Sequence, residues 1–129
     1  MTLAEEKQVQ RKAGIAARRA LAPETRAAAN ATLCARLAAL PCFRQARTIL
    51  LYAAFGGEAE TARGLGKTLA YPVCGENFSL TAAVPGEDGW EAGAYGIRTP
   101  ILSRAEILPP EALDLILVPC TAFDAACGR

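Results

Sequence analysis

Near its end the chain carries an unbroken apolar run, Leu115–Val118, bounded by Asp114 and Pro119. A run with no polar face is typical of a strand covered on both sides, at the centre of a parallel or mixed sheet. Four residues before a proline are too few for a helix. Ligands of open α/β sheets bind beyond the carboxyl ends of the strands. We therefore expect a functional site around the loop that follows this strand, where the sequence ends.

The first part of the chain has the pattern of an amphipathic helix over residues 3–21. Its apolar stripe covers about 60° of the helix surface and is formed by Val9, Ala13, Ala16 and Ala20. Three cations fall within about 40° of one another on the opposite side, namely Lys7, Arg11 and Arg18. Periodicity alone favours a solvated cationic surface over a phosphate-binding one. Pro23, at a first-turn position, begins a second helix that Pro41 ends.

Apolar runs after the second helix predict further strands, at residues 48–54, 68–73 and 78–84, the last of them a candidate edge strand. Residues 90–100 are expected to be irregular, and residues 103–113 to hold a short helical turn before the last strand. Helices followed by strands with interspersed helical segments predict an α/β fold. The length fits a single domain over residues 1–129.

The overall composition is compatible with many classes of soluble protein. The chain is 52% hydrophobic and 21% charged, as in a soluble globular protein. Its net charge of +1 argues neither for nor against a polyanionic partner. No apolar run approaches the roughly 20 residues of a membrane span, and the beginning of the sequence has no signal-peptide core. We therefore expect a cytoplasmic protein.

The histidine and cysteine content limits the kinds of catalytic and metal sites that the chain can form. The sequence has no histidine, which argues against Ser–His and Cys–His catalysis. Its 5 cysteines are scattered without a C-x-x-C pair, so free thiols in a reducing compartment are favoured over a zinc site. Gly64–Thr68 resembles the end of a nucleotide phosphate loop. It lacks the first glycine of that motif, and a predicted strand follows it instead of a helix, so we exclude it.

Several short motifs, spread over nearly the whole chain, resemble those of one enzyme family in type and order. They are Lys7–Arg11, Leu21–Glu24, Ile49–Tyr52 with Glu58–Thr61, Gly66–Pro72, Tyr95–Pro100, and Asp114–Asp124 with Arg129. Their number and order make the chain similar to the 5-formyltetrahydrofolate cyclo-ligases, also called methenyltetrahydrofolate synthetases. The resemblance implies a three-layer, Rossmann-like α/β fold with a mainly parallel or mixed central sheet flanked by helices.

The resemblance also implies an activity and a set of binding residues. The family uses ATP and Mg²⁺: the formyl oxygen of 5-formyltetrahydrofolate takes the γ-phosphoryl group, and phosphate leaves as the ring of 5,10-methenyltetrahydrofolate closes. By resemblance, ATP would be bound by Lys7, Arg11 and Arg129, and the folate by Ala53, Glu58 and Tyr95. No catalytic residue and no protein metal ligand is assigned. Neither a nucleic acid nor a membrane is expected as a partner.

The sequence departs from the family pattern in three places. The family continues after the arginine with a glycine-rich phosphate loop and further elements, whereas this sequence ends at Arg129. A C-terminally truncated fold without that loop, and with doubtful turnover, is therefore expected. The segment between Thr61 and Gly66 is shorter than the family's crossover helix, and Thr99 stands where the family usually has Glu. We expect an unpaired sheet edge beside Leu115–Val118 and a marginally stable, aggregation-prone or partner-dependent chain.

Two alternatives to an active ligase stay open. One is an inactive remnant that still binds folate through Ala53, Glu58 and Tyr95. The other is a nucleic-acid-binding module that uses the face of Lys7, Arg11 and Arg18. The near-neutral net charge and the lack of a basic–aromatic platform argue against this second alternative.

Overall fold

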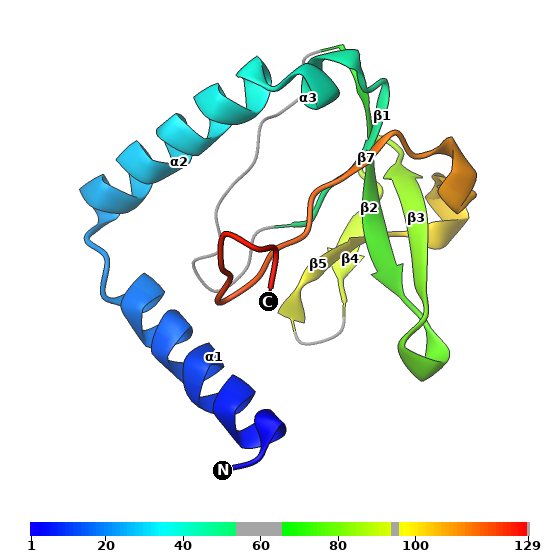
Figure 1. Ribbon diagram of the computed structural model, residues 1–129. Helices are drawn as coiled ribbons and strands as arrows, with labels where there is room; N and C mark the ends of the chain where they lie inside the picture. The colour runs from blue at the N-terminus through cyan, green and yellow to red at the C-terminus, as the bar shows by residue number, and fades with distance from the viewer. Residues whose placement is uncertain (54–65, 94–95, 129) are drawn as a thin grey trace.

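The computed structural model describes residues 1–53, 66–93 and 96–128 (Figure 1). Its helices are α1 (Leu3–Arg19), α2 (Pro23–Ala39) and α3 (Pro41–Gln45). Its strands are β1 (Thr48–Leu50), β2 (Thr68–Cys74), β3 (Leu80–Pro85), β4 (Trp90–Ala92), β5 (Arg98–Pro100), β6 (Ala105–Leu108) and β7 (Leu115–Ile116). Short 3-10 turns lie at Glu76–Phe78, Leu102–Arg104 and Pro110–Ala112.

Five strands form one mixed sheet in the order β6-β3-β2-β1-β7. β1 is parallel to β2 and β7, whereas β3 is antiparallel to β2 and β6. β4 and β5 form a separate antiparallel hairpin that packs against β2. In Figure 1, α1 and α2 lie to one side of the sheet, and the C-terminal segment (red) runs between α1 and the sheet. The predicted α/β class, a mixed sheet flanked by helices, is confirmed.

Local signals explain where the helices begin. Thr2 and Glu5 form a capping box: the Thr2 hydroxyl accepts from the Glu5 backbone N–H at 3.2 Å, and the Glu5 carboxylate accepts from the Thr2 backbone N–H at 2.6 Å. The bond from the Thr2 backbone is the main reason why the pKa of Glu5 is lowered. Pro23 and Pro41 occupy the first turns of α2 and α3. None of the described helices is long and apolar enough to cross a membrane.

A small apolar core attaches the helices to β1. Its buried members are Leu37, Phe43, Ala46, Ile49 and Leu51. Leu37 comes from α2, Phe43 from α3, and Ile49, at the middle of β1, has no exposed surface. Burial of one such side chain contributes about 1.5–3 kcal/mol. The cluster therefore fixes β1, and with it the chain that leaves the carboxyl end of β1.

Asp114 fixes the beginning of β1 through hydrogen bonds. Its carboxylate accepts from the backbone N–H groups of Arg47 at 2.8 Å and Thr48 at 3.0 Å. The bond from Thr48, followed by the bond from Arg47, lowers the pKa of Asp114. The residue that precedes β7 is thereby tied to the residues that begin β1.

Lys67 ties the beginning of β2 to α3. Its ammonium group donates to the carbonyl oxygens of Ala46 at 2.5 Å and Arg44 at 3.2 Å, and lies 5.0 Å from the centroid of the Phe43 ring. Its hydrogen bonds are therefore structural ones to the end of α3. This role agrees with the exclusion of Gly64–Thr68 as a phosphate loop.

Several predicted boundaries are wrong. Residues 90–100 are not irregular, because they contain β4 and β5, and residues 103–113 contain β6 besides the 3-10 turn at 110–112. The strand predicted over 48–54 ends at Leu50, and Ala54 lies outside the described residues. A hairpin and a short edge strand are defined mainly by their pairing partners, which local composition does not specify.

The last strand also differs from its prediction. β7 contains only Leu115–Ile116 and lies at the edge of the described sheet, not at its centre. Ile116 and Val118 are each 53% exposed. The apolar run indicated a strand correctly, but its composition could not specify how many neighbours the strand pairs with. The expected unpaired edge beside this strand is present among the described residues.

Candidate functional site

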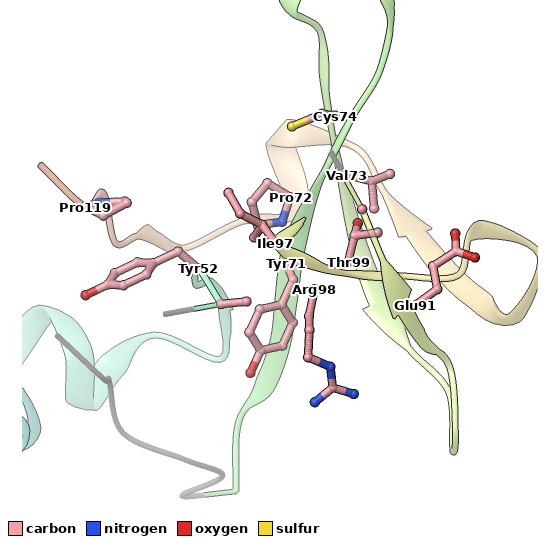
Figure 2. Close-up of a pocket in the computed structure, with 12 residues that line it drawn as sticks. Tyr52, Tyr71, Pro72, Val73, Cys74, Glu91, Ile97, Arg98, Thr99 and Pro119 are labelled. Carbon is pink, nitrogen blue, oxygen red and sulfur yellow. The ribbon is translucent and has the colours of Figure 1, made fainter. Parts of the chain in front are cut away.

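A cavity of about 380 Å³ lies beyond the carboxyl ends of the parallel strands, and we call it the β-end pocket. Its lining consists of Tyr52, Ala53, Tyr71, Pro72, Val73, Cys74, Glu91, Gly93, Ile97, Arg98, Thr99 and Pro119. Tyr52 and Ala53 follow β1, and Pro119 follows β7 closely. The pocket therefore lies where ligands of open α/β sheets bind. Figure 2 shows its labelled side chains, contributed by the chain after β1, by β2, by the hairpin and by the chain after β7.

The hairpin forms one wall of the β-end pocket and is held by aromatic contacts. The rings of Tyr71 on β2 and Trp90 on β4 meet edge to face, with centroids 4.7 Å apart and an interplanar angle of 72°. The guanidinium carbon of Arg98 lies 5.3 Å from the centroid of the Trp90 ring. Together these contacts tie both hairpin strands to the central sheet. These contacts thus hold Arg98 beside the ring of Trp90 at this wall.

Close packing inside the hairpin also depends on a glycine. A Cβ atom at Gly93 would lie 2.8 Å from the carbonyl oxygen of Ile97 and 2.8 Å from Cγ2 of Thr99. Thr99 itself has a buried hydroxyl oxygen with no hydrogen-bond partner among the described residues. It occupies the position where the family usually has Glu, so a different polar group stands at this part of the pocket wall.

A second cavity, of about 360 Å³, lies between α1 and the segment after β7, and we call it the α1 cleft. It is lined by Leu3, Glu6, Lys7, Gln10, Ala122, Phe123, Asp124 and Gly128. Lys7 is exposed at this cleft. Arg11, one helical turn further on, does not line the cleft, and its guanidinium donates to the Gln8 side chain at 2.7 Å.

The opposite wall of the α1 cleft is shaped by Asp124. One oxygen of its carboxylate accepts from the backbone N–H groups of Ala126 and Gly128, both at 2.8 Å. These bonds close a compact turn after Phe123. Glu6 and Asp124 are the carboxylates that line the cleft. No group of three or more potential metal ligands occurs among the described residues.

The structure places only part of the predicted binding set. Lys7 lines the α1 cleft and Ala53 lines the β-end pocket, so the expected ATP-binding and folate-binding residues belong to different cavities. Arg11 lies next to the α1 cleft on the same helix. The predicted residues Glu58, Tyr95 and Arg129 lie outside the described residues.

Some pocket residues were missed by the sequence analysis. Tyr71 and Arg98 lie within motifs that pointed to the family, but neither was singled out as a binding residue. Asp124 also closes such a motif and was not assigned to the cleft. Their motif positions were the available signal. Their contribution to a cavity depends on contacts between distant segments, which the motifs do not reveal.

Comparison with known proteins gives one consistent family. The family model for the 5-formyltetrahydrofolate cyclo-ligase family matches residues 3–129. The NMR structure of Aquifex aeolicus 5,10-methenyltetrahydrofolate synthetase is similar, with 28% identity and a TM-score of 0.76 over 92% of this chain and 62% of that one. No curated protein sequence matches the chain.

A second solved structure shares the fold. It is a 5,10-methenyltetrahydrofolate synthetase from Mycoplasma pneumoniae, with 19% identity and a TM-score of 0.62 over 91% of this chain and 65% of that one. At this identity the likeness shows the fold alone. The chain therefore spans less than two thirds of the length of both solved relatives.

Proposed function

The chain belongs to the 5-formyltetrahydrofolate cyclo-ligase family, and on this premise we propose that it acts in the ATP-dependent conversion of 5-formyltetrahydrofolate to 5,10-methenyltetrahydrofolate. The observation that carries the proposal is the family match over residues 3–129, nearly the whole sequence. The reaction needs a site for the folate and, beside it, a site for the phosphates of a nucleotide, and each of the two cavities has side chains suited to one of these ligands.

The β-end pocket suits the folate. Its volume of about 380 Å³ falls within the usual range of small-molecule sites. Tyr52, Pro72 and Ile97 provide apolar and aromatic surface against which the bicyclic pterin ring system would pack. Ala53, the folate contact expected from the resemblance, adds a small apolar surface at the same wall.

The α1 cleft suits a phosphate group. Lys7 brings an ammonium group to the cleft, and Arg11 lies one turn away on the same helix. ATP would supply the phosphoryl group that activates the formyl oxygen. Phosphoryl transfer depends mainly on positioning and on neutralisation of charge, so a site without histidine is suited to it. Mg²⁺ is held in such sites by one or two carboxylates together with the phosphates, and the carboxylates that line the cleft are those of Glu6 and Asp124.

The arrangement of the cations favours this proposal over a nucleic-acid-binding module. Lys7 lines the α1 cleft, whereas Arg18 is half-buried and its backbone carbonyl accepts from the Arg26 side chain at 3.0 Å. The three cations of the predicted face therefore do not form one open surface. A nucleic-acid-binding surface instead needs cations that track a phosphate backbone.

The test is turnover by the 129-residue chain. With 5-formyltetrahydrofolate, ATP and Mg²⁺, we expect the near-ultraviolet absorbance of the methenyl product to appear, with release of one phosphate per product. Lys7→Ala should raise the KM for ATP roughly 10-fold, because one charge-assisted contact is lost, while the dissociation constant of the folate stays unchanged. Lys12→Ala, on the same helix but outside the cleft lining, is the matched control.

The folate-binding remnant and the nucleic-acid-binding module predict different outcomes. A chain that binds the folate but forms no methenyl product with ATP would contradict the proposal and support a folate-binding protein without turnover. A strongly salt-dependent affinity for RNA, without folate binding, would instead support the nucleic-acid alternative.

A further inference from the structure

One wall of the β-end pocket carries the guanidinium of Arg98, which is held beside the ring of Trp90. Arg98, on β5, is exposed, and it is the one cationic side chain among the described residues that line this pocket. Besides Arg98, the described lining contains one carboxylate, that of Glu91, and is otherwise mostly apolar or aromatic. A single guanidinium at the wall of an apolar pocket gives such a site a preferred orientation for an anionic ligand.

The strand register determines which way Arg98 faces. Arg98 pairs with Ala92, and Thr99 pairs with Glu91. Because successive side chains of a strand point to opposite faces, Arg98 shares a face with Trp90, whereas Glu91 lies on the other face. Figure 2 agrees, because the Glu91 carboxylate is drawn far from the Arg98 guanidinium. The nearest carboxylate along the hairpin is thus not directed at Arg98.

Contact with the indole restrains the guanidinium. It lies 5.3 Å from the Trp90 ring centroid, within the range of a cation–π interaction. The indole is in turn fixed by the edge-to-face contact with Tyr71. Among the described residues the structure gives Arg98 no ion pair. A guanidinium that is held in this way, and that has no ion pair with a described residue, is preorganised for a carboxylate, because little side-chain freedom is lost on binding.

We propose that Arg98 binds the glutamate carboxylates of the folate and so determines the specificity of the β-end pocket for substrates with an anionic tail. This inference rests on the proposed function. The ring system of the folate packs between Tyr52 and Pro72, and the flexible glutamate extends toward the face of the hairpin that carries Arg98 and Trp90. There the guanidinium donates two N–H groups to the two oxygens of a carboxylate, in the bidentate geometry that arginine favours.

The test compares two ligands that differ only in the tail. One is 5-formyltetrahydrofolate, and the other is 5-formyltetrahydropteroylamide, in which an uncharged amide replaces the glutamate. Isothermal titration calorimetry gives the dissociation constant of each ligand without requiring turnover. We expect Arg98→Gln to weaken binding of the folate about 10-fold and to leave binding of the amide nearly unchanged.

Two further variants separate charge from geometry. Arg98→Lys keeps the charge but loses the fork, so its affinity for the folate should fall between those of the wild type and Arg98→Gln. Arg104→Gln removes the same charge from an exposed turn that does not line the β-end pocket, so it should leave both dissociation constants unchanged. Thermal melts of each variant check that the fold is kept.

The outcomes distinguish this inference from the proposed function. If the wild type binds the folate and the amide equally well, or if Arg98→Gln weakens both ligands alike, the role of Arg98 is overturned while folate binding stands. If the wild type binds neither ligand, the proposed function is overturned, and the inference about Arg98 with it.

Discussion

At the scale of single residues, Asp114 shows how one side chain can join distant parts of the chain. Its carboxylate bonds to Arg47 and Thr48, 67 and 66 positions away in the sequence. Its own backbone N–H donates to the Thr48 carbonyl oxygen at 2.9 Å. The beginnings of β1 and β7 are therefore held in register by a group that the sequence presents only as the polar boundary of an apolar run.

Replacement of Asp114 should make stability depend less on pH. Because its hydrogen bonds hold its pKa below the usual value of 3.8, the carboxylate stabilises the fold above that value, and this stabilisation is lost as the pH falls through the lowered pKa. We expect Asp114→Asn to lower the melting temperature by a few degrees at neutral pH, with the difference shrinking in acid. Thermal melts across pH measure this.

The matched control for Asp114 is Glu111→Gln, which removes an exposed carboxylate three positions earlier in the sequence. It should change the melting temperature little at any pH. An Asp114→Asn variant whose deficit stayed constant down to strongly acidic pH would contradict the role assigned to the carboxylate charge.

At the scale of elements, the position of α1 decides whether Lys7 can reach the α1 cleft. No residue of α1 is buried, so apolar packing contributes little to holding this helix. The helix lies close to the rest of the chain at Gly14, where an added Cβ would overlap the carbonyl oxygen of Thr121 and lie 3.1 Å from the carbonyl carbon. Glycine thus allows the helix to lie directly against the chain after β7.

The variant Gly14→Ala tests whether the contact with Thr121 or the helix propensity of residue 14 has the larger effect on α1. Alanine favours an isolated helix by about 1 kcal/mol over glycine, so propensity alone predicts a more protected α1. Overlap with Thr121 predicts the opposite, because the helix must move away. We expect faster tryptic cleavage within α1, by several-fold, measured as an initial rate under native conditions. Ala17→Ser, at an exposed position of the same helix, is the control, and slower cleavage of Gly14→Ala would contradict the contact.

At the scale of the whole molecule, the β7 edge combines an outer strand of the sheet with exposed apolar side chains on and after that strand. Ile116 and Val118 are each 53% exposed, and Phe123, after the strand, is 81% exposed. Among the described residues, no strand pairs with the outer side of β7. A free strand edge beside apolar side chains promotes association with other chains.

Ile116→Lys should reduce self-association without much effect on stability. The side chain is more than half exposed, so its replacement should change the free energy of unfolding by about 0.5 kcal/mol or less, while the added charge opposes edge-to-edge pairing. Sedimentation velocity at several concentrations would report the loss of larger species. Leu102→Lys, in a 3-10 turn and 44% exposed, is the control and should leave association unchanged.

Much of the N-terminal half could be predicted because its signals are local. Helix starts at Pro23 and Pro41 depend on residues within one turn of each proline, and the apolar run around β1 indicates a strand by itself. The β4–β5 hairpin and β6 were missed because their identity depends on partners: Trp90 is fixed by Tyr71, and β6 by pairing with β3. Prediction failed where stabilisation comes from long-range contacts.

The same division holds for the candidate site. The sequence alone determined the α/β class, the family motifs and the presence of Lys7 and Ala53 within them, because each is a property of a short segment. Only the tertiary structure decided that these two residues line separate cavities, that Arg98 faces Trp90 rather than Glu91, and that β7 lies at the sheet edge. Such features depend on how segments distant in sequence meet, and that is settled by packing of the whole chain rather than by any local pattern.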